Sequence, residues 1–131
     1  MLARSAIALL GLTLLSACPS PLEPPIAIIR SGSSAEIAEG DCDDSATTAL
    51  TTELGVAASL HGACSHDPNG LRLRYRWSIV DQPNGSSIAL PNAAVISPTV
   101  VPDLEGRYQL SLVVSNGTLS SEPSFVTVLT D

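Results

Sequence analysis

The sequence contains no lysine, and its six basic side chains, all arginine, stand against 13 acidic ones, which gives a formal net charge of −7. A protein that binds DNA or RNA neutralises phosphates with clusters of Lys and Arg. This balance argues against nucleic acid as a partner.

Groups suited to catalysis are also scarce. His61 and His66 are the only imidazoles, and no G-x-S-x-G motif occurs. Aromatic residues make up 3% of the chain, so few rings are available to stack on a sugar. We therefore expect no enzyme and no cofactor.

The apolar run at residues 5–15 has only 11 residues, whereas a membrane-spanning helix needs roughly 20. Arg4 precedes the run, as in the positively charged start of a signal peptide. Residues 15–18 (Leu-Ser-Ala-Cys) follow, and they resemble the bacterial lipobox. The resemblance implies cleavage after Ala17, diacylglycerol on the Cys18 thiol and acylation of the new amino terminus. The alternative is a secreted protein with a free Cys18.

Several acyl chains hold a protein firmly on a bilayer. Pro19 stands where an Asp favours retention at the inner membrane in enteric bacteria, so the lipobox resemblance points to the outer membrane. We expect a lipid-anchored protein of the bacterial cell envelope. Residues 1–17 would be the signal peptide, and residues 18–25 the lipidated Cys and a Pro-rich tether.

With Cys18 lipidated, Cys42 and Cys64 remain as a pair. In an oxidising, exported compartment such a pair forms a disulfide, and a loop of this length is worth roughly 3 kcal/mol in the chain-entropy estimate. A zinc site that adds His61 and His66 is the alternative. The spacing lacks the paired C-x-x-C arrangement of zinc sites, so we expect the disulfide and no metal.

Residues 71–80 alternate strictly between apolar and polar side chains. One set is Leu71, Leu73, Tyr75, Trp77 and Ile79, and the other is Arg72, Arg74, Arg76 and Ser78. A period of two is typical of a strand with one buried face. The pattern predicts that Trp77 packs in the core near residues 108–112 and that the arginines face outward.

Six further segments are predicted strands separated by Pro-, Gly- and Asn-rich turns, namely 26–30, 56–60, 86–90, 95–101, 107–115 and 125–129. Residues 31–53 lack clean alternation and predict a long loop, pinned by Cys42, with a helical turn near 46–52. Pro98 indicates a sheet edge or bulge. Seven short strands with frequent turns are typical of a β-sandwich.

Several motifs in the second half of the chain occur in a recognisable order. They are L-H-G-A at 60–63, S-H-D-P-N-G at 65–70, L-R-Y-R-W at 73–77, P-T-V-V-P-D at 98–103, G-R-Y at 106–108, L-S-L-V-V-S-N-G at 110–117, S-E-P at 121–123 and V-T-V at 126–128. Over roughly residues 55–130 this order resembles the polycystic kidney disease (PKD) domain. The resemblance implies an all-β, immunoglobulin-like (PKD-type) sandwich of about seven strands within residues 26–131, and an extracellular adhesion or spacer role.

Candidate binding residues lie on two strands. Arg72, Arg74 and Arg76 form a ladder that could bind an anionic partner. The favoured interpretation is a solvated face paired with carboxylates on neighbouring strands. Phe125 is out of phase with its buried neighbours, so we expect it to be the exposed aromatic.

The turn that contains Asp67 and Asn69 is a candidate calcium site. Some PKD domains bind calcium through a D-P-D-G loop, but Asn69 replaces the second acid here. A solvated acidic loop is the favoured interpretation.

These observations favour a non-enzymatic envelope lipoprotein whose PKD-like domain mediates protein–protein or cell-surface contact. The expected partner is a protein or an envelope polysaccharide. Two alternatives stay open: a surface-tethered carbohydrate-binding module, and an accessory subunit of an envelope hydrolase.

Overall fold

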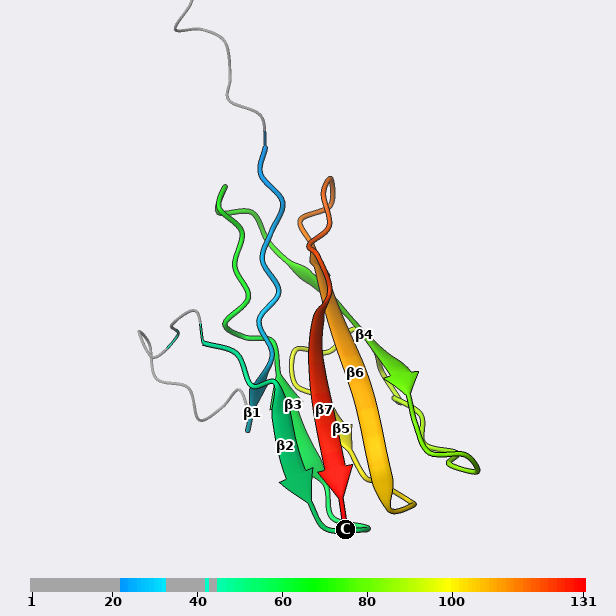
Figure 1. The fold of residues 1–131 in the computed structure, drawn as a ribbon. Helices are drawn as coiled ribbons and strands as arrows, with labels where there is room; N and C mark the ends of the chain where they lie inside the picture. Colours follow the sequence, from blue (N-terminus) through cyan, green and yellow to red (C-terminus); the bar gives the residue numbers. More distant parts are fainter. Residues whose placement is uncertain (1–21, 33–41, 43–44) are drawn as a thin grey trace, which may run out of the picture.

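Strands form where apolar side chains alternate with polar ones. The computed structural model describes residues 22–32, 42 and 45–131, and there it shows seven strands and no helix. They are β1 (Arg30–Ser31), β2 (Ala49–Thr52), β3 (Ala58–His61), β4 (Arg74–Asp81), β5 (Thr99–Val100), β6 (Gly106–Ser115) and β7 (Ser124–Thr130). Sheet β1-β3-β5 lies behind sheet β2-β7-β6-β4 (Figure 1), so the predicted all-β sandwich is confirmed.

The core lies between the two sheets, and each sheet contributes its inward-facing set of apolar side chains. The buried cluster is Ile29, Ala58, Leu60, Trp77, Val100, Tyr108, Leu110, Leu112, Val114, Val126 and Val128. Four of these side chains come from alternate positions of β6, which pairs with β7 on one side and β4 on the other. The period of two at residues 107–115 therefore corresponds to side chains that alternate between the core and the outer face of the sheet.

Trp77 is 2% exposed and lies opposite Leu112 of β6. Its indole N–H donates to the Val95 carbonyl at 2.8 Å, and its backbone N–H donates to the Ala93 carbonyl at 2.8 Å. A buried indole N–H needs such an acceptor. The predicted burial of Trp77 is confirmed.

The predicted start of this strand is wrong. β4 begins at Arg74, and Leu71 is 43% exposed rather than buried. The reason lies in the partner strand: Arg74 pairs with Ser115, the last residue of β6, after which the chain turns. Residues 71–73 extend past that end and have no strand beside them.

β1 and β2 join different sheets. β1 pairs antiparallel with β3, whereas β2 pairs in parallel with β7. The Thr47 backbone N–H donates to the Ile29 carbonyl at 2.8 Å, so the chain returns to β1 before it enters the second sheet. The predicted helical turn at 46–52, and a loop throughout 31–53, are therefore wrong, because the edge of β7 binds residues 49–52 as a strand.

Three other predicted strands are lost or shortened, and the predicted strand 56–60 is observed as Ala58–His61 in β3. Residues 86–90 form no strand, and 95–101 shortens to β5, at the edge of the three-stranded sheet that Pro98 indicated. In 26–30 only Arg30 belongs to a strand, although Ile26 forms a bridge with His66. A strand at the edge of a sheet pairs with a neighbour on one side only, so less of its length is held in a ladder.

Tyr108 ties the start of β6 to the turn before it. Its hydroxyl accepts from the Leu104 N–H at 3.0 Å and lies 2.9 Å from both the Leu104 carbonyl and Asp103 Oδ1. A tyrosine at the start of this strand that bonds back to the preceding backbone is the tyrosine corner of immunoglobulin-like sandwiches.

Asp103 also holds residues 86 and 87. Its carboxylate accepts hydrogen bonds from the Ser86 hydroxyl and from the Ser87 N–H, the latter at 2.8 Å. The Ser86 bond first, then the Ser87 N–H and the Tyr108 hydroxyl, lower the pKa of Asp103 from 3.8 to about 2. These bonds also explain why residues 86–90 do not extend into a strand.

Asp103 should make the domain sensitive to acid. Because the folded-state pKa is depressed, its contribution to stability is present above the ordinary Asp pKa of 3.8 and is lost as the pH falls toward about 2. We expect Asp103→Asn to unfold at a lower temperature at pH 7 and to lose less stability than the wild type over that window. Thermal melts by circular dichroism at several pH values measure this, and parallel pH curves for the two proteins would contradict it.

Candidate functional site

A groove with a volume of about 780 Å³ lies beside the first half of β4. Residues 71–75 line one side of it, and Ala94, Ile96 and Asn116 complete the lining. Its surface is mixed: Leu71 and Ile96 are exposed apolar side chains, and two arginines of the ladder, at 72 and 74, stand among them.

The groove forms because residues 93–96 contact the edge of β4 only at Trp77 and then turn toward the other sheet. Ala93 binds the backbone of Trp77, and then the Ile96 carbonyl accepts from the Gly62 N–H at 2.8 Å on the other sheet's side. Gly62 itself lies close against the four-stranded sheet, since a Cβ there would lie 2.7 Å from the Leu112 side chain and 3.3 Å from the Tyr75 ring. The edge of β4 before Trp77 is left uncovered.

Arg72, Arg74 and Arg76 are exposed, as predicted. Within residues 22–32, 42 and 45–131, none of the three guanidinium groups has an ion-pair partner. The predicted pairing with carboxylates on neighbouring strands is therefore wrong for the described part of the chain. Unpaired arginines remain available for an anionic ligand.

Tyr75 lies between the core and the groove. Its ring packs against the core cluster and lines the groove as well, and burial raises its pKa. Its hydroxyl has no hydrogen-bond partner among the described residues. A phenol placed in this way can donate to a ligand.

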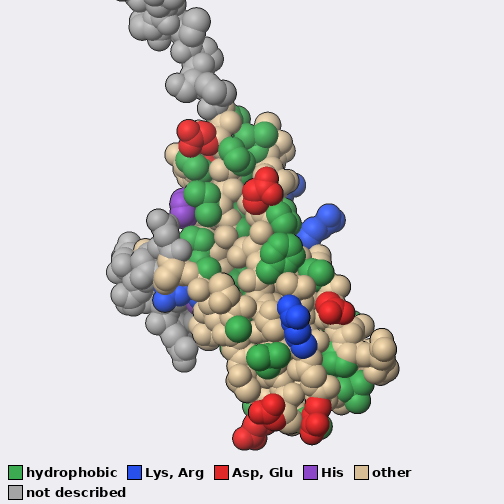
Figure 2. All heavy atoms as spheres, in the orientation of Figure 1, with side chains coloured by type: hydrophobic (Ala, Val, Ile, Leu, Met, Phe, Trp, Pro, Cys, Tyr) green, Lys and Arg blue, Asp and Glu red, His purple; other side chains and the backbone are tan. Residues whose placement is uncertain are grey.

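Phe125 is 46% exposed on the outer face of the four-stranded sheet, as predicted. It lies opposite Ser111 of β6, and Leu129 of β7 is exposed on the same face. Figure 2 shows this face: apolar and arginine side chains lie over the sheet, and most acidic side chains lie toward its two ends.

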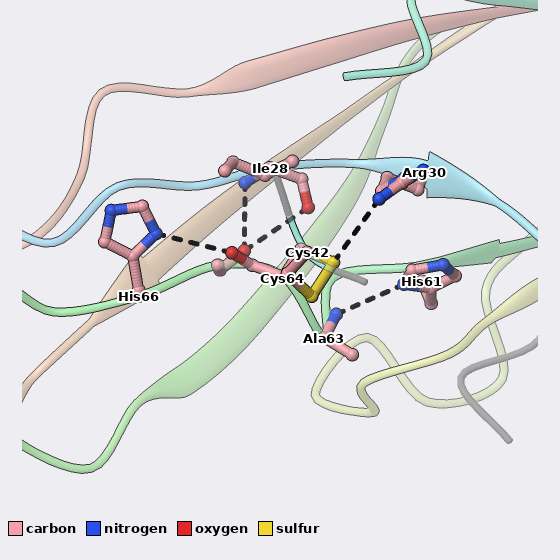
Figure 3. Close-up of a disulfide and its surroundings, with 8 residues drawn as sticks. Ile28, Arg30, Cys42, His61, Ala63, Cys64 and His66 are labelled. Carbon is pink, nitrogen blue, oxygen red and sulfur yellow. Dashed lines mark hydrogen bonds between the residues drawn. A yellow bond between two sulfur atoms is a disulfide. The ribbon is translucent and has the colours of Figure 1, made fainter. Parts of the chain in front are cut away.

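Cys42 and Cys64 are joined in a disulfide with a Cα–Cα distance of 5.3 Å (Figure 3), as predicted. Neither sulfur is then a thiolate, which excludes the four-ligand zinc alternative.

His61 Nδ1 accepts a hydrogen bond from the Ala63 N–H at 3.4 Å. The pKa of His61 is lowered, first by burial and then by the charge of Arg30.

The Asp67 carboxylate is occupied by its own turn. It accepts from the backbone N–H groups of Asn69 and Leu71 at 3.0 and 2.9 Å, and from the Asn116 side chain at 3.0 Å. The Leu71 N–H contributes most to lowering the pKa of Asp67, followed by Asn116. The Asn69 side chain donates to the Glu23 carbonyl at 3.0 Å. These bonds position the start of the groove wall.

No group of three or more His, Cys, Asp or Glu side chains is arranged for a metal ion in the described part of the chain. Ser65 and His66, next to the Asp67 turn, contact backbone groups. The Ser65 hydroxyl accepts from the Ile28 N–H at 2.9 Å, and His66 Nδ1 lies 3.4 Å from the Cys64 carbonyl.

Cys18, the signal peptide at 1–17, the first part of the tether at 18–25, and residues 33–41, 43 and 44 of the predicted loop lie outside the described residues. Among the residues that are described, no helix is long and apolar enough to cross a membrane.

Comparisons with known proteins place the fold. No protein-family model and no curated protein matches the chain. A nucleoside hydrolase-related hypothetical protein from Saccharophagus degradans that is associated with carbohydrate metabolism matches with a TM-score of 0.64 and 22% identity. That match covers 84% of this chain and 26% of the other, so this chain spans about a quarter of that protein. The PKD domain from KIAA 1837 protein matches with a TM-score of 0.51 and 27% identity, over 76% of this chain and 92% of that one. The sandwich described above is thus a PKD-like fold.

Proposed function

We propose that this chain is a non-enzymatic, lipid-anchored module of the bacterial cell envelope whose PKD-like domain binds another protein. The groove beside β4 carries the proposal, because it combines exposed apolar side chains, a tyrosine and unpaired arginines. Tyr and Arg are enriched in protein interfaces and dominate their binding energy. The PKD-like fold supports the same role.

Site-specific cross-linking tests this function in the envelope. A photo-reactive amino acid replaces Leu71, at the groove, in the full-length chain, and the matched control replaces Leu129, an exposed leucine on β7. We expect a discrete protein adduct from position 71 and none of the same size from position 129. Identical adducts from both positions, or none from position 71, would contradict the proposal.

A carbohydrate ligand is the second candidate, and the exposure of Phe125 favours it. A glycan array with the wild type, Phe125→Ala and, as the matched control, Leu129→Ala distinguishes the two functions. Strong glycan binding that Phe125→Ala abolishes and Leu129→Ala preserves would replace the protein-binding proposal.

The lipid anchor rests on the lipobox-like residues 15–18. We expect Cys18→Ala to abolish labelling by radioactive palmitate and the stable membrane association of a mature form, since the thiol that carries diacylglycerol is gone. Cys42→Ala, which keeps Cys18, is the control and should stay labelled. A labelled membrane band of unchanged intensity in Cys18→Ala would refute the anchor.

A further inference from the structure

The backbone of β4 offers unpaired hydrogen-bonding groups to the groove. β4 is the last strand of its sheet and pairs only with β6. Because the Trp77 N–H donates to Ala93, it points away from β6. Alternate residues of a strand direct these groups to the same side, so the N–H and C=O of Tyr75 also point away from β6. No other residue of the described chain pairs with that side of Tyr75.

The side chains of this edge alternate in chemistry. Arg72, Arg74 and Arg76 are exposed and unpaired, whereas Leu73 and Tyr75 pack partly against the core. A strand that lay beside this edge would place every second residue near an arginine and the residues between them near apolar groups.

We propose that the groove binds an extended acidic segment of a partner protein as an additional strand on β4. This inference rests on the proposed protein-binding function and specifies its ligand. Backbone bonds to Tyr75 supply affinity, carboxylates at alternate positions contact the arginines, and apolar side chains between them lie against Leu73 and Tyr75.

The structure also limits the length of that segment. The contact between Trp77 and Ala93 closes the edge of β4, so an added strand stops there. Residues 71–75 line the groove, and five extended residues span about 17 Å. The bound segment is therefore short, on the order of five residues.

A second copy of this chain fits the edge poorly. Antiparallel pairing of two β4 edges brings the arginine ladders together, and like charges directly opposite each other destabilise a sheet. Charged side chains on an edge strand are a common protection against self-association. The same charges attract an acidic segment, which makes the site selective for a different chain.

The test uses the full-length lipidated chain in detergent and three fluorescein-labelled octapeptides. In the first, Glu and Val alternate. The second has the same sequence with N-methyl groups on alternate backbone amides, and the third has Lys in place of Glu. We expect measurable binding of the first peptide by fluorescence anisotropy and slower amide hydrogen exchange at Tyr75. The other two peptides should bind at least about tenfold more weakly, because they lose the backbone donors or the charge complementarity.

The double variant Arg72→Glu and Arg74→Glu should weaken binding of the first peptide at least about tenfold, because two ion pairs become two repulsions. Arg107→Glu, a matched exposed control on β6, should change it less than about twofold. Circular dichroism checks that both variants fold.

Each contrary result overturns the proposal in a defined way. Failure of the wild type to bind the first peptide at about 1 mM, or equal binding of the N-methylated peptide, excludes strand addition. Equal binding by the double variant excludes the groove as the binding site.

Two other results would assign the edge of β4 to a different ligand. A dimer seen by sedimentation and lost in the double variant Arg72→Glu and Arg74→Glu would assign it to a second copy of this chain. An anionic polysaccharide that binds at the groove more tightly than the peptide would assign it to a glycan. If the position-71 adduct persists while the peptides fail, the protein-binding function stands and only strand addition is wrong.

Discussion

Replacing Trp77 with Ala is expected to lower the free energy of unfolding by about 3–5 kcal/mol. The indole is 2% exposed within the core cluster, so its removal leaves a large cavity. It also leaves the Val95 carbonyl without its 2.8 Å donor. A domain of this size is stable by only about 5–15 kcal/mol, so the loss is a large share of its total stability. Urea unfolding followed by circular dichroism gives the difference.

Arg74→Ala is the matched control for Trp77→Ala, because Arg74 is an exposed residue of the same strand. Its cost should stay within about 0.5 kcal/mol. Trp77 is also the only tryptophan, so in the wild type its emission should be blue-shifted and weakly quenched by iodide. Equal destabilisation by the two substitutions, or strong quenching in the folded state, would refute the burial of Trp77.

Removing the disulfide with the double substitution Cys42→Ser and Cys64→Ser is expected to cost about 2–5 kcal/mol. The bridge ties Cys42 to Cys64, which is buried beside β1. Without the bridge the unfolded chain gains conformational freedom, and the native state buries a serine in place of half-cystine. Urea unfolding measures the loss.

Cys18→Ser is the control for the disulfide, because it removes a cysteine and keeps the bridge; its unfolding free energy should match the wild type. A reductant should destabilise the wild type and Cys18→Ser, and leave the double variant unchanged. Free Cys42 and Cys64 thiols found by mass spectrometry of the unreduced protein would show that the bridge is absent.

The strands predicted best from sequence are the ones buried on one face and paired along their length. β6 and β7 match their predicted ranges to within one residue at each end, because alternation in sequence records alternation between core and solvent. β2 was missed because it is an edge strand with no fully buried side chain, so its residues carry no periodic signal. The apparent strand at 86–90 fails because Asp103 accepts hydrogen bonds from the Ser86 hydroxyl and from the Ser87 N–H and hydroxyl.

The candidate site was predicted in part. The arginine ladder and the exposure of Phe125 follow from the phase of their strands. The groove could not be predicted, because Ala94 and Ile96 belong to a loop whose position depends on the bonds from Trp77 to Ala93 and Val95. Burial along a strand leaves a pattern with a period of two in the sequence, and that pattern can be recognised. A single contact between a loop and a strand leaves no such pattern.

The position of the disulfide determines how the domain would respond to tension. The described chain begins at one end of the sandwich and the C-terminus lies at the other (Figure 1), so a force between them runs along the strands. At Cys42 that force crosses the sulfur bridge directly to Cys64. β2 and β3 lie within the covalent loop, so they bear no tension along their own backbones. With a sequence separation of 22 residues, the bridge shortens the length that an unfolding event can release by about 75 Å at roughly 3.4 Å per residue.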